Sequence, residues 1–568
     1  MSANAELARI FLEMSAILEL TGANAFRVNA YARASRVLND LTVDVADLAD
    51  RKQLVAIAGI GDGTAKRILE FLDTAEIAAH KTLLDEVPHG LLELLKISGL
   101  GPKTVRVLWE QGGVTGMPSL VEKLDSGEIQ KLPRMGAKTV ANIRESIAFA
   151  ASAGKRARLG TALPLAEHIV EYLRRVPGTT RVEYAGSLRR GRETIGDVDI
   201  LASTAHPDTL HAAFQSMPGV IKVLVAGETK SSIRLEPGMQ VDLRVVEAAS
   251  FGAALLYFTG SKAHNVVLRE RAVRMKMSLN EYGMTGGAAV AADTETGIYT
   301  ALGLPYIPPE MREDRGEFAL TETPRLVEIG DIRAELHAHT VASDGRFTIE
   351  TLARCAADRG YHTVAVTDHS QSSGQANGLS PDRLLEHIDA IHAANAEFDG
   401  ITILAGAEVD ILADGRLDYD DEILARLDVV VASPHSTLRQ DPETATKRLL
   451  AAVRHPLVHV LGHPTGRIVN RREGLHPDIR RLAEAAAEHD TALELNANSL
   501  RLDLRDTHIR AAVEAGATVA VNTDAHEPEH FDELRYGIMT ARRGWLEAER
   551  CVNTWPARKL MRWLRSKR

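Results

Sequence analysis

Two aspartates separated by a single valine, Asp197 and Asp199, end the stretch GSLRRGRETIGDVDI at residues 186–200. Short β-branched runs before this stretch and from Asp197 onward predict strands. Side chains at i and i+2 of a strand point to one face, so the two carboxylates can converge on a divalent cation. Such oxygen ligands suit Mg²⁺ or Mn²⁺ shared with substrate phosphates. The alternative is a surface strand with solvated charges, which leaves the preceding glycine, serine and arginines unexplained.

A phosphate-binding arrangement precedes these carboxylates. The Gly-Ser pair at 186–187 can present backbone amides and a hydroxyl to one phosphate, and Arg189 or Arg190 can hold another by a forked contact. A third carboxylate, Asp242, lies in the alternating strand pattern VDLRVV at 241–246. Three carboxylates beside a phosphate cradle indicate a two-metal site for in-line displacement at phosphorus.

The order of these motifs resembles that of the family X DNA polymerases, within the nucleotidyltransferase superfamily: GS, two arginines, GDxD and a distant aspartate on a strand. The resemblance implies that Asp197, Asp199 and Asp242 are catalytic and bind Mg²⁺ or Mn²⁺ in the polymerase site. It also implies a set of residues that bind the incoming dNTP: Ser187, Arg190, Gly196, Tyr257, Phe258, Gly260, Asn265 and Arg269.

Within that set the resemblance assigns Tyr257 and Phe258 to the sugar of the nucleotide. It assigns Asn265 to the base edge and Arg269 to the template. The alternative for the two aromatic residues is a place in the hydrophobic core. One position departs from the vertebrate repair enzymes, which have an arginine two residues before the third carboxylate, where this chain has Gln240. The difference fits the bacterial branch and bears on how the primer hydroxyl loses its proton.

Three glycine-containing hairpins lie between predicted helices in the first 150 residues: IAGIGDGTAKRI, ISGLGPKTVRVL and LPRMGAKTVANI. A glycine hairpin that opens a helix exposes backbone amides at the favourable end of the dipole, which suits a phosphate. One such hairpin could be a plain connection, but three resemble the helix-hairpin-helix motif. The resemblance implies a sequence-independent grip on gapped or nicked DNA, with a monovalent cation at the motifs. The DNA-binding residues expected on this basis are Gly59, Gly61, Gly99, Gly101, Lys103, Gly136, Lys138, Arg27 and Tyr31.

In the family, the first of these segments can form a sugar-phosphate lyase whose lysine makes a Schiff base with an abasic sugar. Alignment of GIGDGTAKRILEFL with that pattern puts Arg67 in the lysine position. Arginine stays protonated and cannot be that nucleophile, and the adjacent Lys66 is rotated by about 100° around the helix. We therefore expect Arg27 and Tyr31 to bind a 5′-phosphate without lyase chemistry.

Short apolar runs alternate with helical stretches between residues 335 and 525, as in a parallel α/β barrel. The runs end in metal-competent or polar residues, and the C-terminal ends of barrel strands converge on one mouth. The motifs HAHTVASDG, TDH, AGAE, PH, GHP and TDAH resemble the polymerase and histidinol phosphatase (PHP) domain. That domain is a distorted seven-stranded barrel that holds up to three Mn²⁺, Zn²⁺ or Fe ions.

The PHP resemblance implies three groups of metal ligands: His337, His339, Glu408 and Asp524 for one ion, Glu408 with His435 and His463 for a second, and Asp344, His369 and His526 for a third. Many polymerase-linked PHP domains have lost ligands, whereas every motif position is filled here. Mixed histidine and carboxylate ligands suit ions that activate water near neutral pH. The implied activities are those of a 3′→5′ exonuclease, an abasic-site endonuclease or a 3′-phosphatase.

The fold class expected from these motifs is multidomain α/β, with a helical N-terminal region, a nucleotidyltransferase palm, a thumb-like nucleotide-selection subdomain and a C-terminal distorted (β/α)7 barrel. The expected domains are a lyase-like DNA-binding domain at 1–80, a helical subdomain with two further hairpins at 81–155, the palm at 156–246, the nucleotide-selection subdomain at 247–315, a linker at 316–334 and the PHP domain at 335–568.

Composition sets bounds on partners and compartment. The net charge is −10 at pH 7, but Lys and Arg outnumber Asp and Glu within residues 101–200, where DNA would bind. The two cysteines, Cys355 and Cys551, form no CxxC motif, and no apolar run approaches the ~18 residues that a membrane helix needs. We expect a monomer in the cytoplasm, associated with the nucleoid and without membrane contact.

Together these patterns predict a bacterial family X DNA polymerase that fills short gaps in base-excision or break repair and carries a PHP nuclease. One alternative makes the nuclease primary and the polymerase core a DNA-positioning module. Another is a non-catalytic repair scaffold. Template-independent nucleotide addition and a preference for ribonucleotides stay open, because few residues decide them.

Overall fold

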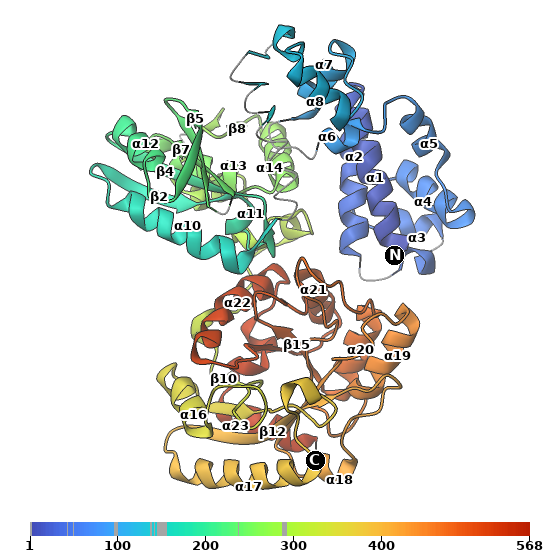
Figure 1. The fold of residues 1–568 in the computed structure, drawn as a ribbon, viewed down its shortest axis with the longest axis vertical. Helices are drawn as coiled ribbons and strands as arrows, with labels where there is room; N and C mark the ends of the chain where they lie inside the picture. Colours follow the sequence, from blue (N-terminus) through green and yellow to red (C-terminus); the bar gives the residue numbers. More distant parts are fainter. Residues whose placement is uncertain are drawn as a thin grey trace. The chain divides into compact units, whose positions relative to one another are not determined.

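The computed structural model describes residues 3–41, 44–48, 50–95, 100–133, 135–136, 139–140, 143–144, 156–236, 238–286 and 292–567. The chain divides into two compact units, Met1–Lys155 and Arg156–Arg568 (Figure 1). No helix of these described residues is long and apolar enough to cross a membrane.

Helices make up the described part of the first unit, as its apolar spacing predicts. The elements are α1 Ala3–Leu20, α2 Ala25–Asp40, η1 Val45–Leu48, α3 Arg51–Ala56, α4 Asp62–Thr74, α5 Ala78–Asp85, α6 Leu91–Leu94, α7 Pro102–Glu110, α8 Met117–Asp125 and η2 Ile129–Lys131. Leu7, Phe11 and Met14, at helical spacing on α1, are almost fully buried in its core. Two expected DNA-binding residues, Gly99 and Lys138, lie outside the described residues.

A five-stranded mixed sheet opens the second unit. The elements of this region are β1 Ala157–Arg158, α10 Leu159–Arg174, β2 Thr179–Tyr184, α11 Gly186–Arg189, β3 Thr194–Ile195, β4 Asp197–Thr204, α12 Pro207–Gln215, β5 Val220–Ala226, β6 Lys230–Leu235 and β7 Met239–Val245. Strands β1 and β3 pair with each other in a separate two-stranded antiparallel sheet. The strand order is β2-β4-β7-β6-β5, in which only the β4–β7 pair is parallel. Apolar residues of α10 and α12 pack against one face of the sheet. The parallel pair brings the start of β4 beside β7.

A smaller subdomain follows the sheet. Its elements are η3 Ala248–Ser250, α13 Phe251–Thr259, α14 Lys262–Arg274, β8 Ser278–Asn280, β9 Gly283–Thr285 and α15 Glu295–Ala301. Helix α13 packs through Phe251 against Ala185, which follows β2, and against Leu201 of β4. Leu268 on α14 and Tyr299 on α15 belong to a second cluster, which also includes Leu326 and Trp545 from later in the chain.

The acidic segment after this subdomain is irregular, with the short turns η4 Pro309–Met311, η5 Glu317–Ala319 and η6 Ile329–Asp331. It is not a solvated linker throughout, because Arg312 and Glu317 are fully buried. Nη1 of Arg312 is 2.5 Å from Oε1 of Glu295, and Glu317 accepts a 2.8 Å hydrogen bond from the His264 ring. A buried ion pair to α15 and a buried hydrogen bond to α14 therefore hold this segment in place.

A parallel barrel forms the rest of the second unit. Its elements are β10 Ala334–Glu335, α16 Ile349–Asp358, β11 Thr363–Val366, η7 Gly374–Ala376, α17 Pro381–Glu397, β12 Thr402–Asp410, α18 Asp421–Leu424, β13 Val429–Ser433, α19 Pro442–Val453, β14 Val460–Leu461, α20 Ile479–His489, β15 Ala492–Asn496, α21 Asp506–Glu514, β16 Val519–Asn522, η8 Pro528–Glu533, α22 Leu534–Arg543, η9 Ala548–Arg550, η10 Val552–Thr554 and α23 Ala557–Ser566.

The seven barrel strands pair in sequence order, each parallel to the next. A parallel bridge between Ala338 and Ala525 joins the segments that follow β10 and β16, so the barrel is nearly closed. Figure 1 shows α16, α17, α19 and α20 around its outside. The alternation of apolar runs and helices thus correctly predicts a seven-stranded parallel barrel.

The barrel and the palm share hydrophobic core. Leu502, after β15, and Tyr536, on α22, belong to the same buried cluster as the apolar residues of α10. At the other end of the barrel, Leu560 and Trp563 of α23 pack against the starts of the strands. Helix α23, the basic C-terminal helix, therefore caps the barrel.

Candidate functional site

Strand register brings the palm carboxylates together. Strands β4 and β7 pair in parallel with Asp199 opposite Asp242, and Asp197 lies two residues before Asp199 on the same face. Gly186 lies against this group, because a Cβ added to it would be 2.5 Å from Oδ2 of Asp199. The glycine of the GS motif thus lets α11 begin directly beside the carboxylates, with Ser187 in its first turn.

The three carboxylates disfavour one another's negative charge. Burial raises the pKa of Asp199 to about 7, and the neighbouring Asp197 and Asp242 add to the shift. Burial and Asp242 also raise the pKa of Asp197. Divalent cations relieve such crowding, and all-oxygen ligands suit Mg²⁺ or Mn²⁺. The donor set therefore fits a divalent-metal site.

Two further side chains contact Asp242. Nζ of Lys230, on β6, is 2.6 Å from Oδ2 of Asp242, and Nε2 of Gln240 donates to its Oδ1 at 3.0 Å. Sequence reasoning does not single out Lys230. Its position becomes informative only through the antiparallel pairing of β6 with β7.

The two arginines of the GS motif have different partners. Arg189 makes two 2.8 Å hydrogen bonds to the carboxylate of Glu295. Arg190 donates from Nε to Glu313 at 3.0 Å and from Nη1 to the carbonyl of Thr259 at 2.5 Å. Within the described part of the chain no group accepts a hydrogen bond from its Nη2. Arg189 therefore holds the palm to α15, whereas the Nη2 group of Arg190 is available to donate a hydrogen bond to a ligand.

A small pocket between α13, α14 and β8 is lined by Tyr257, Asn265 and Arg269. Asn265 donates to the carbonyl of Tyr257 at 2.7 Å, and Arg269 donates to the carbonyl of Asn265 at 3.3 Å. Tyr257 is 36% exposed and is not a core residue. Phe258 packs edge-on against Tyr257, and the guanidinium of Arg244 lies 4.4 Å from its ring centre.

Two glycines of the predicted nucleotide set lie in crowded places. Gly260 has a φ of +67° at the end of α13, and a Cβ there would be 3.2 Å from Nη1 of Arg190. At Gly196 a Cβ would be 2.8 Å from Nη1 of Arg156. Gly260 therefore favours glycine through its backbone conformation, whereas at Gly196 the flexible end of the Arg156 side chain could move aside.

The glycines of the hairpins fall into two kinds. Gly61 and Gly101 are the N-cap residues of α4 and α7, and apart from the adjacent residues no atom of the described chain lies within 4 Å of a Cβ added to either. A Cβ added to Gly136 likewise meets no atom of the described residues within 4 Å. Gly59, in contrast, has a φ of +98° and packs closely on Val37. Gly59 shapes its hairpin, while Gly61 and Gly101 leave helix N-termini open to a phosphate.

The lyase-like region has an arginine held in place. Arg67 donates to Glu70 at 2.9 Å, and Glu70 and the neighbouring Tyr31 raise its pKa, whereas Lys66 is exposed. Arg27 is exposed in the first turn of α2, beside Phe26, which is 85% exposed and was not singled out from the sequence. Lys103 is likewise exposed, in the first turn of α7.

The predicted PHP metal ligands meet at the C-terminal ends of the barrel strands. Glu408, on β12, lies at their centre: its carboxylate is 2.9 Å from Nδ1 of His369 and 2.8 Å from Nε2 of His463. Nε2 of His435 is 3.2 Å away. Nε2 of His339 lies 3.6 Å from Glu408 and 3.0 Å from Oδ1 of Asp524. His337 completes this side of the cluster, with Nε2 3.4 Å from Glu408.

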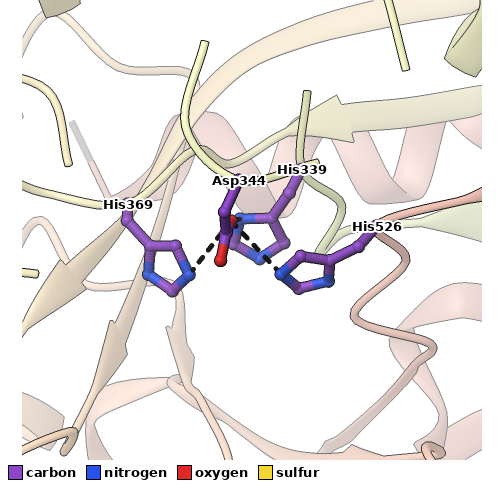
Figure 2. A group of neighbouring side chains, drawn as sticks. All are labelled: His339, Asp344, His369 and His526. Atoms are coloured by element: carbon purple, nitrogen blue, oxygen red, sulfur yellow. Dashed lines mark ion pairs between the residues drawn. The ribbon is translucent and has the colours of Figure 1, made fainter. Parts of the chain in front are cut away.

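Three overlapping groups have donor atoms close enough to share an ion: His339, Asp344, His369 and His526; His337, His339 and Asp524; and His369, Glu408 and His435. In the first group the rings of His369 and His526 lie on either side of the Asp344 carboxylate (Figure 2). The geometry therefore groups His369 with Glu408 and His435, whereas the motif resemblance pairs His435 with His463.

Unpaired buried atoms show that this cluster fits metal ions. Among the described residues these atoms lack a hydrogen-bond partner: Nε2 of His337, both ring nitrogens of His339, Nδ1 of His369 and His463, Oε2 of Glu408 and Oδ1 of Asp524. Buried polar atoms without partners are costly, and ions held by imidazole and carboxylate ligands satisfy them. Burial alone would lower the pKa of His435, but Glu408 and Asp410 outweigh it and raise the pKa to about 10. The carboxylates of the cluster thus favour a positive charge at its centre.

A cavity of about 370 Å³ opens beside this cluster. The candidate metal ligands Asp344, Asp524 and His526 form one wall. The other lining residues are Arg346, Ile468, Asn498, Leu500, Arg501, Glu527 and His530. Positive and apolar groups beside a metal cluster suit a ligand that carries both a phosphate and a base.

Known proteins and family models match almost the whole length of the chain. Family models match a helix-hairpin-helix domain at 2–77, a SAM-like helix-hairpin-helix tandem at 91–148, the DNA polymerase beta thumb at 254–313 and the PHP domain at 335–498. The chain is 38% identical over 554 residues to the DNA polymerase/3′-5′ exonuclease PolX of Bacillus subtilis, covering 96% of this chain and 97% of that protein. The chain belongs to the bacterial family X DNA polymerases with a PHP domain.

Part of this family X member also resembles two shorter proteins. A probable phosphatase of Caldanaerobacter subterraneus is 32% identical over 35% of this chain and 79% of its own length. The probable phosphatase YcdX of Escherichia coli O81 is 30% identical over 41% of this chain and 94% of its own length. The full-length match to a polymerase favours the polymerase interpretation over the one that makes the nuclease primary.

Two acidic residues of the barrel support the candidate ligands and do not belong to the motif set of the family. Oε1 of Glu494 is 2.7 Å from Nδ1 of His337, and its Oε2 accepts a 2.7 Å hydrogen bond from the backbone of His463. Asp410 accepts a hydrogen bond from Nδ1 of His435. Such contacts fix a ring so that its other nitrogen faces the cluster. The sequence signal for both is their place at the end of an apolar strand run.

Proposed function

We propose that this chain fills short gaps in DNA during repair and trims 3′ ends with a metal-dependent 3′→5′ exonuclease. The register that sets Asp199 opposite Asp242, with Asp197 on the same face, carries the polymerase half of the proposal. The cluster around Glu408 carries the nuclease half. The full-length similarity to a DNA polymerase/3′-5′ exonuclease supports both.

At the palm, Asp197, Asp199 and Asp242 would hold Mg²⁺ or Mn²⁺, which neutralises phosphate charge and favours loss of the primer hydroxyl proton. The hydroxyl of Ser187 and the open Nη2 of Arg190 bind the triphosphate of the incoming dNTP. Of the residues at the small pocket, Tyr257 contacts the sugar, Asn265 the base edge and Arg269 the facing template. The other members of the nucleotide site are Gly196, Phe258 and Gly260.

At the barrel, the clustered histidines and carboxylates would hold Mn²⁺, Zn²⁺ or Fe ions, which activate water and neutralise the scissile phosphate. Arg501 and Arg346 bring positive charge to the cavity, while Leu500 and Ile468 offer an apolar wall to a base. A 3′-terminal nucleotide has both features. Abasic-site cleavage and 3′-phosphate removal use the same chemistry and are the second candidates for this site.

DNA binding belongs to the helical first unit. Gly61 and Gly101 present open helix N-termini to the backbone, and Lys103 adds positive charge. Because Arg67 replaces the lysine of the lyase pattern, this region binds a 5′-phosphate without cleaving the sugar. We assign DNA binding to 1–155, nucleotidyl transfer to 156–315 and phosphodiester hydrolysis to 335–568, with action on chromosomal DNA at the nucleoid.

The test uses gapped DNA with a 5′-labelled primer and Mn²⁺, with and without dNTPs. Wild type should extend the primer when dNTPs are present and shorten it when they are absent. Asp242→Ala should lose extension only, and His339→Ala should lose shortening only. Extension without shortening would reduce the barrel to a scaffold, and shortening without extension would overturn the polymerase proposal.

A further inference from the structure

A buried network connects the barrel to the palm loop that carries Arg190. Arg543, at the end of α22, has a side chain that is 2% exposed. Its Nη1 donates to the backbone carbonyl of Arg190 at 2.6 Å and to Oε1 of Glu313 at 3.0 Å. The same Oε1 accepts from Nε of Arg190 at 3.0 Å. Arg543 thus contacts the backbone of Arg190 directly and its guanidinium through Glu313.

Arg543 is fixed from the barrel side as well. Its Nε and Nη2 donate to Oδ2 of Asp506, at the start of α21, at 3.1 and 2.8 Å. Burial alone would raise the pKa of Asp506, but Arg543 and Arg315 outweigh it and hold the pKa well below its usual range. The carboxylate therefore stays charged and keeps the guanidinium of Arg543 in one orientation.

The palm loop also packs directly on α22. Gly191 has a φ of +65°, and a Cβ added to it would be 3.1 Å from the Cβ of Met539. The turn after Arg190 can approach the barrel helix this closely because it carries no side chain there. Loop and helix are therefore in contact through both backbone and side chains.

The charges around Arg190 leave room for an anion. Arg190 and Arg543 share a single carboxylate oxygen of Glu313, and Nη1 of Arg192 lies 3.8 Å from the same oxygen. Glu313 thus faces three guanidiniums, of which Arg543 is also paired with Asp506. Nε and Nη1 of Arg190 are occupied, and its Nη2 is the nitrogen without an acceptor in the described residues. A phosphate oxygen at Nη2 would supply the missing negative charge.

We propose that Arg543 is a positioning residue for nucleotide binding. It acts through Arg190 and Glu313, orienting Arg190 so that Nη2 faces the triphosphate of the incoming dNTP. The inference rests on the triphosphate-binding role proposed above for Arg190. Its consequence is that the barrel contributes to the nucleotide affinity of the polymerase site in addition to its own hydrolysis.

The test measures gap filling by the full-length protein at varied dNTP concentration. Arg543→Ala should raise the KM for dNTP about tenfold and change kcat much less, because misplacing a substrate-binding group weakens binding before it alters the chemistry. Arg543→Lys should restore part of the affinity, since one ammonium can replace only some of the forked contacts. A second readout is the Kd of dNTP for the complex with a dideoxy-terminated gapped DNA, which involves no turnover.

Arg535→Ala is the matched control. Arg535 lies on the same helix and pairs with Glu167 of α10, so it crosses the same junction without touching Arg190. Its removal should leave the KM within about twofold of wild type. An equal rise in KM for Arg535→Ala and Arg543→Ala would overturn the proposal, because it would show a general loosening of the junction.

The Arg190→Ala variant separates this inference from the proposed function. If Arg190→Ala leaves the KM unchanged, the triphosphate role of Arg190 fails and the inference fails with it. If Arg190→Ala raises the KM but Arg543→Ala does not, only the inference fails. In the variant that carries both Arg190→Ala and Arg543→Ala, we expect the increase in KM to differ from the sum of the two single effects.

If Arg543→Ala does not fold, as judged by lost exonuclease activity, Asp506→Asn replaces it in the test. This substitution releases Arg543 from its carboxylate partner without removing the arginine. An unchanged KM in folded Asp506→Asn would overturn the inference.

Discussion

Lys230 is paired with Asp242 across neighbouring strands, with Nζ 2.6 Å from Oδ2. The vertebrate pattern places a cation two residues before this carboxylate on its own strand, a position that Gln240 occupies here. Lys230, on the neighbouring strand β6, thus supplies to Asp242 the positive charge that the vertebrate pattern supplies from the same strand.

We expect Lys230→Gln to lower the kcat of gap filling about tenfold, because Asp242 would lose the cation that holds it beside Asp199. Gln240→Arg in the Lys230→Gln background should restore much of the rate, since residues two apart on a strand face the same side. Single-turnover primer extension measures both. A kcat for Lys230→Gln within twofold of wild type would refute the role, and exonuclease activity serves as the folding control.

The hydrogen bond between Glu494 and His337 predicts a change in metal affinity at the barrel. Glu494→Gln keeps the size of the side chain but removes the charge that orients His337, so the affinity for Mn²⁺ should fall about 10–100-fold. Titration calorimetry with Mn²⁺ measures the affinity directly. Exonuclease activity should recover at higher Mn²⁺, while gap filling stays unchanged. Glu484→Gln, on the surface of α20, is the control; an identical Mn²⁺ affinity in both variants would contradict the role.

The hairpin glycines predict a separation of DNA binding from stability. Gly101→Ala places a methyl group in open space, so the protein should fold normally. The methyl should weaken binding to gapped DNA several-fold, because it obstructs the approach of a phosphate to the helix N-terminus. Gly59→Ala should instead lower the melting temperature, since Gly59 has a φ of +98°. Fluorescence anisotropy and thermal melts distinguish the two; unimpaired DNA binding by Gly101→Ala would exclude a phosphate there.

The buried carboxylate of Glu295 predicts a pH dependence of stability. Burial alone would raise its pKa, but Arg312 and Arg189 outweigh burial and lower the pKa from 4.5 to about 2. Because the folded-state pKa is the lower one, the stabilisation is fully present above pH 4.5 and is lost as the pH falls toward 2. Glu295→Gln should therefore cost about 3 kcal/mol at pH 7 and less at pH 3. Urea unfolding at the two pH values measures the difference, and an equal cost at both would count against the ion pairs.

Spacing along the chain was sufficient to predict several parts of this protein. The i, i+2 aspartates at 197 and 199 and the alternating run around Asp242 predict strands whose carboxylates share a face. The apolar runs that end in His, Asp or Glu predict the parallel barrel. These inferences succeed because strand periodicity is local, and parallel strands necessarily bring equivalent ends together.

Other features depend on contacts between distant segments. Arg189 and Arg190 are adjacent and chemically identical, yet one is bound by Glu295 and the other by Glu313. Nothing in their spacing distinguishes them, because the difference arises from the packing of α15 and of the irregular segment that follows it. The grouping of His369 with Glu408 and His435 likewise depends on how far each strand extends before its ligand.

The sequence by itself determined the family, the order of the domains and the residue types available for two metal sites, because all of these follow from local periodicity and motif order. Only the tertiary structure decided that Lys230 faces Asp242, that Glu494 supports His337 and that Arg543 reaches Arg190. Each pairing joins different strands, segments or domains. Their positions follow from how the hydrophobic faces pack, which no single segment specifies.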